Sequence, residues 1–255
     1  MRKINIVIGA AIFTALIIPP SYKASAAANC DFTNGLKELS KAQAVSMSDD
    51  SSESIKNELT ARKNLINQAI DCSTSETLSL QSDIKLVDTG YPGLEDIQNS
   101  IISKLDDALN YYQAQKNSVN DLGIEGSKTF SINLKSWRDS NYVPVAELGR
   151  NFIIFAKNQY ILQTTQNRFN QISITLKTLQ LADNQKINDY LNQADKNLGM
   201  ANDENEQIKD AFKTMAWPND ISGLIDSSLG HMKDTYQSFF DISKEAQDII
   251  SSSKQ

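Results

Sequence analysis

The sequence predicts an all-α protein, an elongated antiparallel bundle of about five to seven helices with coiled-coil-like packing. Apolar residues recur every three or four positions through most of the chain, which is the period of an α-helix. Only three prolines lie beyond residue 20, at Pro92, Pro144 and Pro218, and the 255 residues include ten glycines. A β-sandwich or barrel needs more turns than so few glycines and prolines provide.

The first 26 residues have the pattern of a signal peptide. Two basic residues precede a mostly apolar run over 4–18, and Ala24-Ser25-Ala26 provides a cleavage site after Ala26. Ala27 is then the first mature residue, although a cut after Ala28 is an alternative. An uncleaved membrane anchor is the rival interpretation, but the run is short for a span. We therefore expect a signal peptide over 1–26, a tethered N-terminal segment over 27–51 and the helical bundle over 52–255.

The mature chain is acidic and has no further membrane segment. Removal of 1–26 leaves 22 basic and 31 acidic residues, a net charge of −9. No basic cluster occurs, so nucleic acid and anionic lipid surfaces are poor partner candidates. No mature apolar run approaches transmembrane length, so we expect no stable membrane insertion. No Asn-x-Ser/Thr sequon occurs, which favours bacterial export to the periplasm, the cell surface or the medium.

The two cysteines, Cys30 and Cys72, suggest a disulfide. An exported chain meets an oxidising environment, and an even cysteine count suits a bridge. The closed loop of roughly 40 residues could stabilise the fold by about 3–4 kcal/mol in the chain-entropy model. Lipidation of Cys30 is the functional rival, but the residues before it, Ala27 and Asn29, do not fit the lipidation pattern. Two free thiols or a redox pair are the remaining alternatives.

The bundle helices are expected in order from their apolar stripes and turn signals. A short helical pattern over 31–47 and a polar loop over 46–54 precede them. Asp88 to Gly93 reads as a turn, and Gly123 reads as a helix ending, so 94–140 forms either two helices or one kinked helix. With the break at Gly123, the helices span 53–87, 94–122, 127–140, 144–181, 186–216 and 220–250.

The helix over 144–181 should be central. Pro144 suits its first turn, where a missing N–H costs little. Gln159 and Gln166 fall on its apolar stripe, as polar residues that set register do. Isoleucines off the stripe imply contact with more than one neighbour. The stripe consists of Val145, Leu148, Phe152, Phe155, Leu162, Phe169, Ile172, Leu176 and Leu179.

The helix over 186–216 has the most regular heptad pattern. Its apolar positions run from Ile187 to Met215 in alternating steps of four and three, with Asn205 at an a position. We expect Asn205 to be a buried amide paired across helices, or a device that fixes the register of self-association.

Four aromatic residues near the prolines form a candidate tip: Tyr91, Trp137, Tyr142 and Trp217. If every helix reverses direction, the connections at Pro92, Pro144 and Pro218 fall at one end of the bundle. If 94–140 is one helix, Tyr91 is left at the opposite end. The cluster is expected to be either a rigid plug that closes the bundle or a partner-binding end, since rigid aromatics are favoured interface anchors.

The sequence offers little chemistry for catalysis. His231 is the only histidine, which excludes His-rich metal sites and leaves a single imidazole base, and no P-loop, GxGxxG or GxSxG occurs. The carboxylates at Asp106-Asp107 and around Asp203-Glu204 read as solvated helix surface. No metal or cofactor is expected.

We therefore expect a non-enzymatic exported structural or interaction protein, with an unknown protein partner or self-association. The alternatives are an α-helical pore-forming toxin component and a hydrolase with an unrecognised site. The apolar run over 143–162 contains Glu147, Arg150 and Lys157, which makes it a poor membrane segment.

Overall fold

The computed structural model describes residues 30–214 and 218–252, and this part of the chain is helical apart from short connections, which confirms the all-α class. The α-helices are α1 (Thr33–Ser48), α2 (Ser52–Lys85), α3 (Leu94–Ser118), α4 (Ile124–Trp137), α5 (Val143–Thr178), α6 (Gln185–Lys213) and α7 (Pro218–Ser252). A 3₁₀ turn, Val119–Asp121, follows α3, and a π-helical segment, Arg138–Tyr142, joins α4 to α5.

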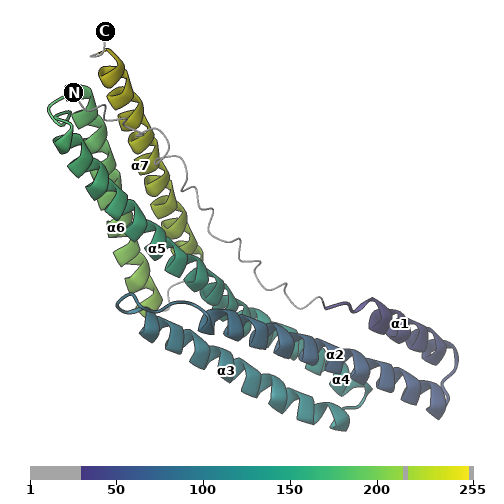
Figure 1. Ribbon diagram of the computed structural model, residues 1–255. Helices are drawn as coiled ribbons and strands as arrows, with labels where there is room; N and C mark the ends of the chain where they lie inside the picture. Colours follow the sequence, from purple (N-terminus) through teal and green to yellow (C-terminus); the bar gives the residue numbers. More distant parts are fainter. Residues whose placement is uncertain (1–29, 215–217, 253–255) are drawn as a thin grey trace.

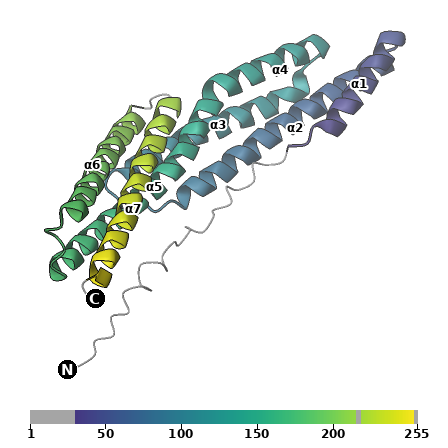
Figure 2. The ribbon, with the colours of Figure 1, turned by 90° about the horizontal axis from the view of Figure 1, so that it is seen from above.

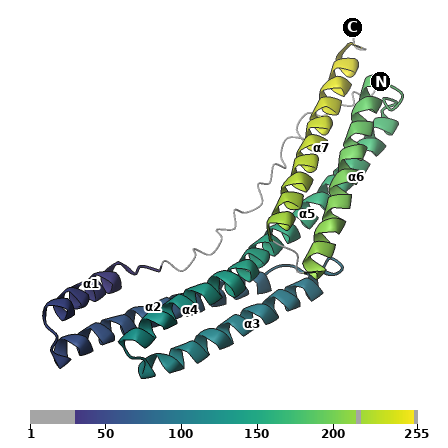
Figure 3. The ribbon, with the colours of Figure 1, turned by 180° about the vertical axis from the view of Figure 1, so that it is seen from behind.

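The molecule is a bent rod made of two helical bundles that share α5 (Figure 1). The proximal bundle contains α2, α3, α4 and the first half of α5, and the distal bundle contains the second half of α5 with α6 and α7. Viewed from above and from behind, α5 passes through the bend in both cases (Figures 2 and 3). It packs against α2, α3, α6 and α7, as its apolar residues on more than one face predict.

The chain reverses between α3 and α4, but not before Pro144. Residues 119–123 break the helix, so 94–140 is not one continuous helix. The expected reversal at Tyr142–Pro144 is wrong, because α4, the π segment and α5 form one uninterrupted helical run. Pro144 has no N–H to donate to Ser140, and its ring crowds the carbonyl one turn earlier. The wider turn accommodates this, with the Val143 N–H donating to the carbonyl of Arg138, five residues back.

The helix ends follow local chemistry. The Ser51 hydroxyl accepts a hydrogen bond from the Ser54 N–H at the start of α2, and the Asn184 side chain does the same for the Ile187 N–H in α6. At the end of α5, Leu181 N–H donates to Leu176 C=O and Gln180 N–H to Lys177 C=O. This is a Schellman ending, in which the left-handed position is occupied by Gln180 (φ 58°) rather than glycine.

The apolar core is unevenly divided between the two bundles. Among the described residues, one cluster of 22 buried side chains fills the proximal bundle and the bend, where Phe152 and Phe155 of α5 meet Phe212 of α6. The distal bundle has two small clusters, of four and three buried residues, centred on Leu162 and Leu176. The distal bundle therefore gains much less free energy from apolar burial.

Buried polar residues lie between successive apolar clusters along the distal bundle. Asn205 is 1% exposed, as expected for a seam position, and Gln159 is also buried. Gln166, expected on the same stripe, is exposed, because α5 turns Asn158 and Thr165 inward instead. The buried polar side chains of this bundle are Asn158, Gln159, Thr165, Asn197, Asn205, Ser228, Thr235 and Ser238.

Substitution of Gly149 by valine should destabilise the fold by about 1–3 kcal/mol through overpacking. A Cβ at this position would lie 2.8 Å from Ile84 Cδ1 and 3.4 Å from Leu80 Cδ2, where α5 crosses α2. Gly199 is the matched control, since a Cβ there meets nothing within 4 Å and Gly199→Val should leave stability unchanged or slightly raised. Urea denaturation of the two variants measures the difference, and equal midpoints would show that α5 and α2 are not in close contact.

Candidate functional site

The first candidate surface is the hairpin of α1 and the start of α2, which projects beyond the turn between α3 and α4 (Figure 1). That turn meets α2 where Lys63 Nζ donates to the Asn120 carbonyl at 2.6 Å. Four large apolar side chains on the hairpin are exposed: Leu36 (55%), Val45 (46%), Met47 (90%) and Ile55 (42%). Exposed carboxylates at Asp50 and Glu53 lie at the turn between α1 and α2, close in sequence to Met47 and Ile55. The end of the hairpin is therefore both apolar and acidic.

The hairpin is held together by little apolar burial. The buried residues of α1 are Gly35 and Ser46. A Cβ at Gly35 would lie 2.9 Å from Leu65 Cδ1, so the α1 backbone packs closely on side chains of α2. The Ser46 hydroxyl donates to the Glu58 carboxylate, and this bond, helped by Arg62, lowers the pKa of Glu58. These contacts orient α1 but bury little surface, so its attachment needs a further constraint.

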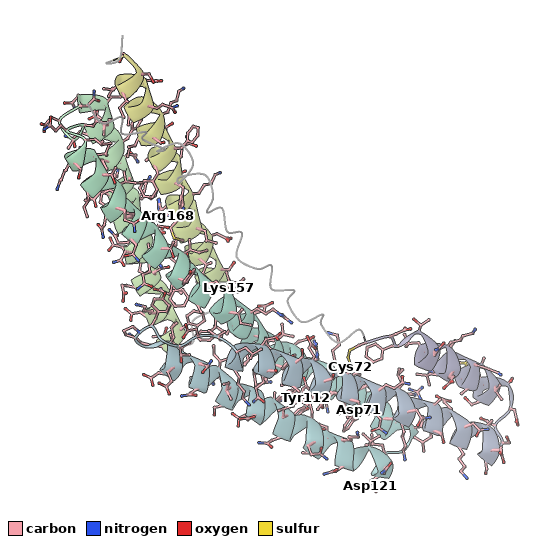
Figure 4. The ribbon with its side chains drawn as sticks, in the orientation of Figure 1. Asp71, Cys72, Tyr112, Asp121, Lys157 and Arg168 are labelled. Atoms are coloured by element: carbon pink, nitrogen blue, oxygen red, sulfur yellow. A yellow bond between two sulfur atoms is a disulfide. The ribbon has the colours of Figure 1, made fainter. Side chains whose placement is uncertain are left out.

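The disulfide between Cys30 and Cys72 supplies that constraint. The structure pairs these two cysteines, and the bridge ties the segment just before α1 to the middle of α2. Figure 4 shows Cys72 where the chain leading into α1 meets α2, with Tyr112 nearby on α3. The loop closed by the bridge contains α1 and the first half of α2, so the crosslink fixes the whole projecting hairpin to the bundle.

The second candidate is a cluster of one arginine and four aromatic rings beside this attachment. Trp137 stacks on Tyr111, with ring centroids 3.6 Å apart and planes 10° from parallel. Tyr112 presents its edge both to Trp137, at 5.5 Å, and to Tyr142, at 6.0 Å. Arg138 lies over the ring of Tyr142, 5.2 Å from its centroid. We call these five residues the arginine–aromatic cluster.

Glu76 on α2 binds the cluster to the bundle. Its carboxylate accepts a bond from Arg138 at 2.6 Å and one from Arg150 at 3.4 Å, and it is 18% exposed. Arg138 and Tyr142 are four residues apart at the two ends of the π segment, so they lie on the same side of the helix. The Asn141 side chain donates to the Trp137 carbonyl at 3.0 Å, which satisfies a backbone acceptor inside the altered turn.

The hydroxyls of Tyr112 and Tyr142 are buried in the cluster with no hydrogen bond of ordinary length among the described residues, although Ser73 and Thr77 of α2 lie close enough to them to oppose the rise in pKa. Burial raises the pKa of Tyr112 to about 12 and also raises the pKa of Tyr142. Each weakly bonded buried hydroxyl costs free energy, whereas the rings stabilise the fold through packing. The cluster therefore packs α3 against the end of α4 and the π segment, and the Arg138–Glu76 ion pair joins it to α2.

The aromatic residues expected at one tip lie in different places. Trp137 and Tyr142 are together in the cluster, and Tyr142 is 1% exposed, which does not suit a binding tip. Tyr91, in the turn between α2 and α3, donates to Gln163 Oε1 of α5 at 2.8 Å. The reason is the missing reversal before Pro144, which leaves Trp137 and Tyr142 within a continuous helix. Trp217, Ala26 and Ala27 lie outside the described residues.

The polar residues singled out by the sequence have identifiable partners. Asn158 Nδ2 donates to Asn205 Oδ1 at 3.0 Å and to Ser228 Oγ at 3.1 Å, which joins α5, α6 and α7. The Ser227 hydroxyl donates to Glu204 Oε1 at 2.5 Å, and His231 Nε2 lies 3.4 Å from the same oxygen. Gln81 donates to Asp106 at 2.7 Å. Sequence reasoning anticipated the Asn205 pairing but missed Glu76 and Arg138, which are 62 positions apart.

The described residues contain no group of three or more His, Cys, Asp or Glu side chains placed to hold a metal ion. In the same part of the chain, no helix has the length and apolar character needed to cross a membrane. Comparison with protein families, curated proteins and solved structures gave no match.

Stability should fall as the pH rises from 10 to 12, because the unfolded tyrosines lose their protons while Tyr112 keeps its own. The folded pKa of about 12 exceeds the usual value of 10.0, so the folded state binds more protons over this window. Tyr112→Phe should retain the stability at pH 7 and make the fall shallower. Urea denaturation at several pH values measures both, and a Tyr112→Phe profile parallel to the wild type would contradict the assignment.

Proposed function

We propose that the chain is an exported, non-enzymatic interaction protein of the cell envelope or extracellular space, which binds a protein partner through the α1–α2 hairpin. The observation that carries this proposal is the hairpin end, where Val45, Met47 and Ile55 are exposed on a helical hairpin that a disulfide ties to the bundle. Apolar side chains that are exposed on an ordered element are favourable contact points for a partner.

Export is supported by the signal-like N-terminus together with the disulfide. Disulfides persist in oxidising compartments outside the cytosol. The bridge also has a role in binding, because a hairpin that is already ordered loses less conformational entropy when a partner docks. A tethered α1 therefore serves recognition better than a freely moving one.

The chemistry of the hairpin end indicates the chemistry of the partner. Met47 is 90% exposed and has a flexible, polarisable side chain that adapts to an apolar groove. Asp50 and Glu53 add negative charge beside it. The complementary partner surface is an apolar groove bordered by Lys or Arg, because opposite charges steer the encounter and fix orientation.

The double variant Met47→Ser/Ile55→Ser should lose the partner without losing stability, because both side chains are exposed. The immobilised protein, prepared from an export-competent host, is used to capture proteins from an envelope extract, which mass spectrometry identifies. Binding should weaken at least tenfold in the variant and fall with rising salt.

Ile174→Ser is the matched control, since Ile174 is 65% exposed but lies near the far end of α5 in the distal bundle. It should bind as the wild type does. A partner retained equally by the double variant and the control would place the binding surface elsewhere, and capture of no specific protein would refute the proposed function.

A further inference from the structure

The contact between α5 and the α6–α7 hairpin is built around polar groups that are incompletely paired. Among the described residues of this contact, Asn158 Oδ1, Gln159 Nε2 and Asn205 Nδ2 are buried without a hydrogen-bond partner. Each such atom weakens the association relative to an apolar contact of the same shape. In contrast, α6 and α7 pack most extensively against each other. They therefore form a unit that can separate from α5 without coming apart.

The connection that holds this unit against α5 is strained. Gln180 has φ 58°, and it is the one described non-glycine residue with positive φ. A side chain with a Cβ disfavours this conformation roughly fivefold or more relative to the right-handed region. The turn over 179–184 has the sequence LQLADN, which contains neither glycine nor proline. Nothing in its composition prevents the turn from becoming helical.

A straightened connection would also keep the apolar face of the two helices continuous. Leu176 of α5 and Ile187 of α6 belong to the same small cluster in the folded chain. Their positions differ by 11 residues, which is close to three full turns of an α-helix. In one continuous helix, these two side chains would therefore lie on the same face and could bury against one partner.

We propose that the distal bundle exchanges its α6–α7 hairpin between two copies of this chain. In the exchanged dimer, α5 and α6 of each copy form one helix, and the hairpin of each copy packs on α5 of the other. The occupant of the surface that α6–α7 leaves on α5 is thus a second copy, because that copy presents the same complementary hairpin. This inference rests on the distal bundle and not on the partner binding proposed above.

The buried polar layer would specify the register of the exchanged dimer. Asn158 of one copy would donate to Asn205 and Ser228 of the other, reproducing the bonds that measure 3.0 Å and 3.1 Å within one chain. A shifted register would leave all three residues buried without partners, which is how a single seam asparagine selects an alignment. Since the closed and exchanged forms share these contacts, the connection over 179–184 determines their balance.

The test compares Gln180→Ala with Gln180→Gly. Both remove the side chain, but only glycine relieves the left-handed conformation of the closed form. The dimer contains two straightened connections, and glycine disfavours each of them. The association constant for dimerisation should therefore be at least about 30-fold lower for the glycine variant than for the alanine variant. Light scattering after size-exclusion chromatography measures it, using the full disulfide-bonded protein equilibrated at several concentrations.

A second variant gives a decisive result even if the association constants of the two Gln180 variants fall outside the measurable concentration range. Deletion of Ala182 and Asp183 shortens the connection so that α6 cannot fold back on its own α5, and the protein should become an obligate dimer with unchanged helix content by circular dichroism. A monomeric deletion variant with native helix content would overturn the proposal. Equal dimerisation of Gln180→Ala and Gln180→Gly, or no dimer for either, would overturn it as well.

Discussion

The structure depends on one helix burying two different faces. The first half of α5 packs into the proximal core through Phe152 and Phe155, whereas the second half faces α6 and α7 through Leu162 and Leu176. No other described helix belongs so fully to both bundles. The bend of the molecule follows from this, because the helices that cover the two faces leave α5 in different directions (Figure 1). The π segment continues the same helix into α4, so Trp137 and Arg138 extend the proximal contact.

The two bundles use this shared helix in physically different ways. The proximal bundle combines a large apolar core with a disulfide and the Glu76–Arg138 pair, which together support the projecting hairpin. The distal bundle alternates small apolar clusters with buried amides and hydroxyls. Apolar burial provides stability and polar layers provide register. A disulfide-tethered end that binds a partner and an exchangeable end that binds a second copy are consistent with that division.

Periodicity predicted most of the fold because most helices bury a single stripe. In α3, the apolar residues that recur every three or four positions are all buried: Leu94, Ile97, Ile101, Leu105, Ala108 and Tyr112. In α6, the heptad placed Asn205 correctly on the seam. The stripe of α5 was less accurate, and Gln166 is exposed, because a helix with two buried faces has no single stripe. Pro144 was misleading for a related reason, because its local sequence looks the same whether it opens a helix or follows a π turn. Contacts of Trp137 and Tyr142 with residues of α3 determine that the chain continues as a helix here.

Hydrogen exchange followed by mass spectrometry tests the shared role of α5 most directly. If both cores depend on this helix, amides over 148–162 open only when the whole protein unfolds, and they should exchange more slowly than those of any other segment. Amides of α1, which buries little, should exchange fastest among the helices, and those near the ends of α6 and α7 should be intermediate. Exchange over 148–162 as fast as in α1 would contradict the account, because α5 would then not be the element on which the two bundles depend.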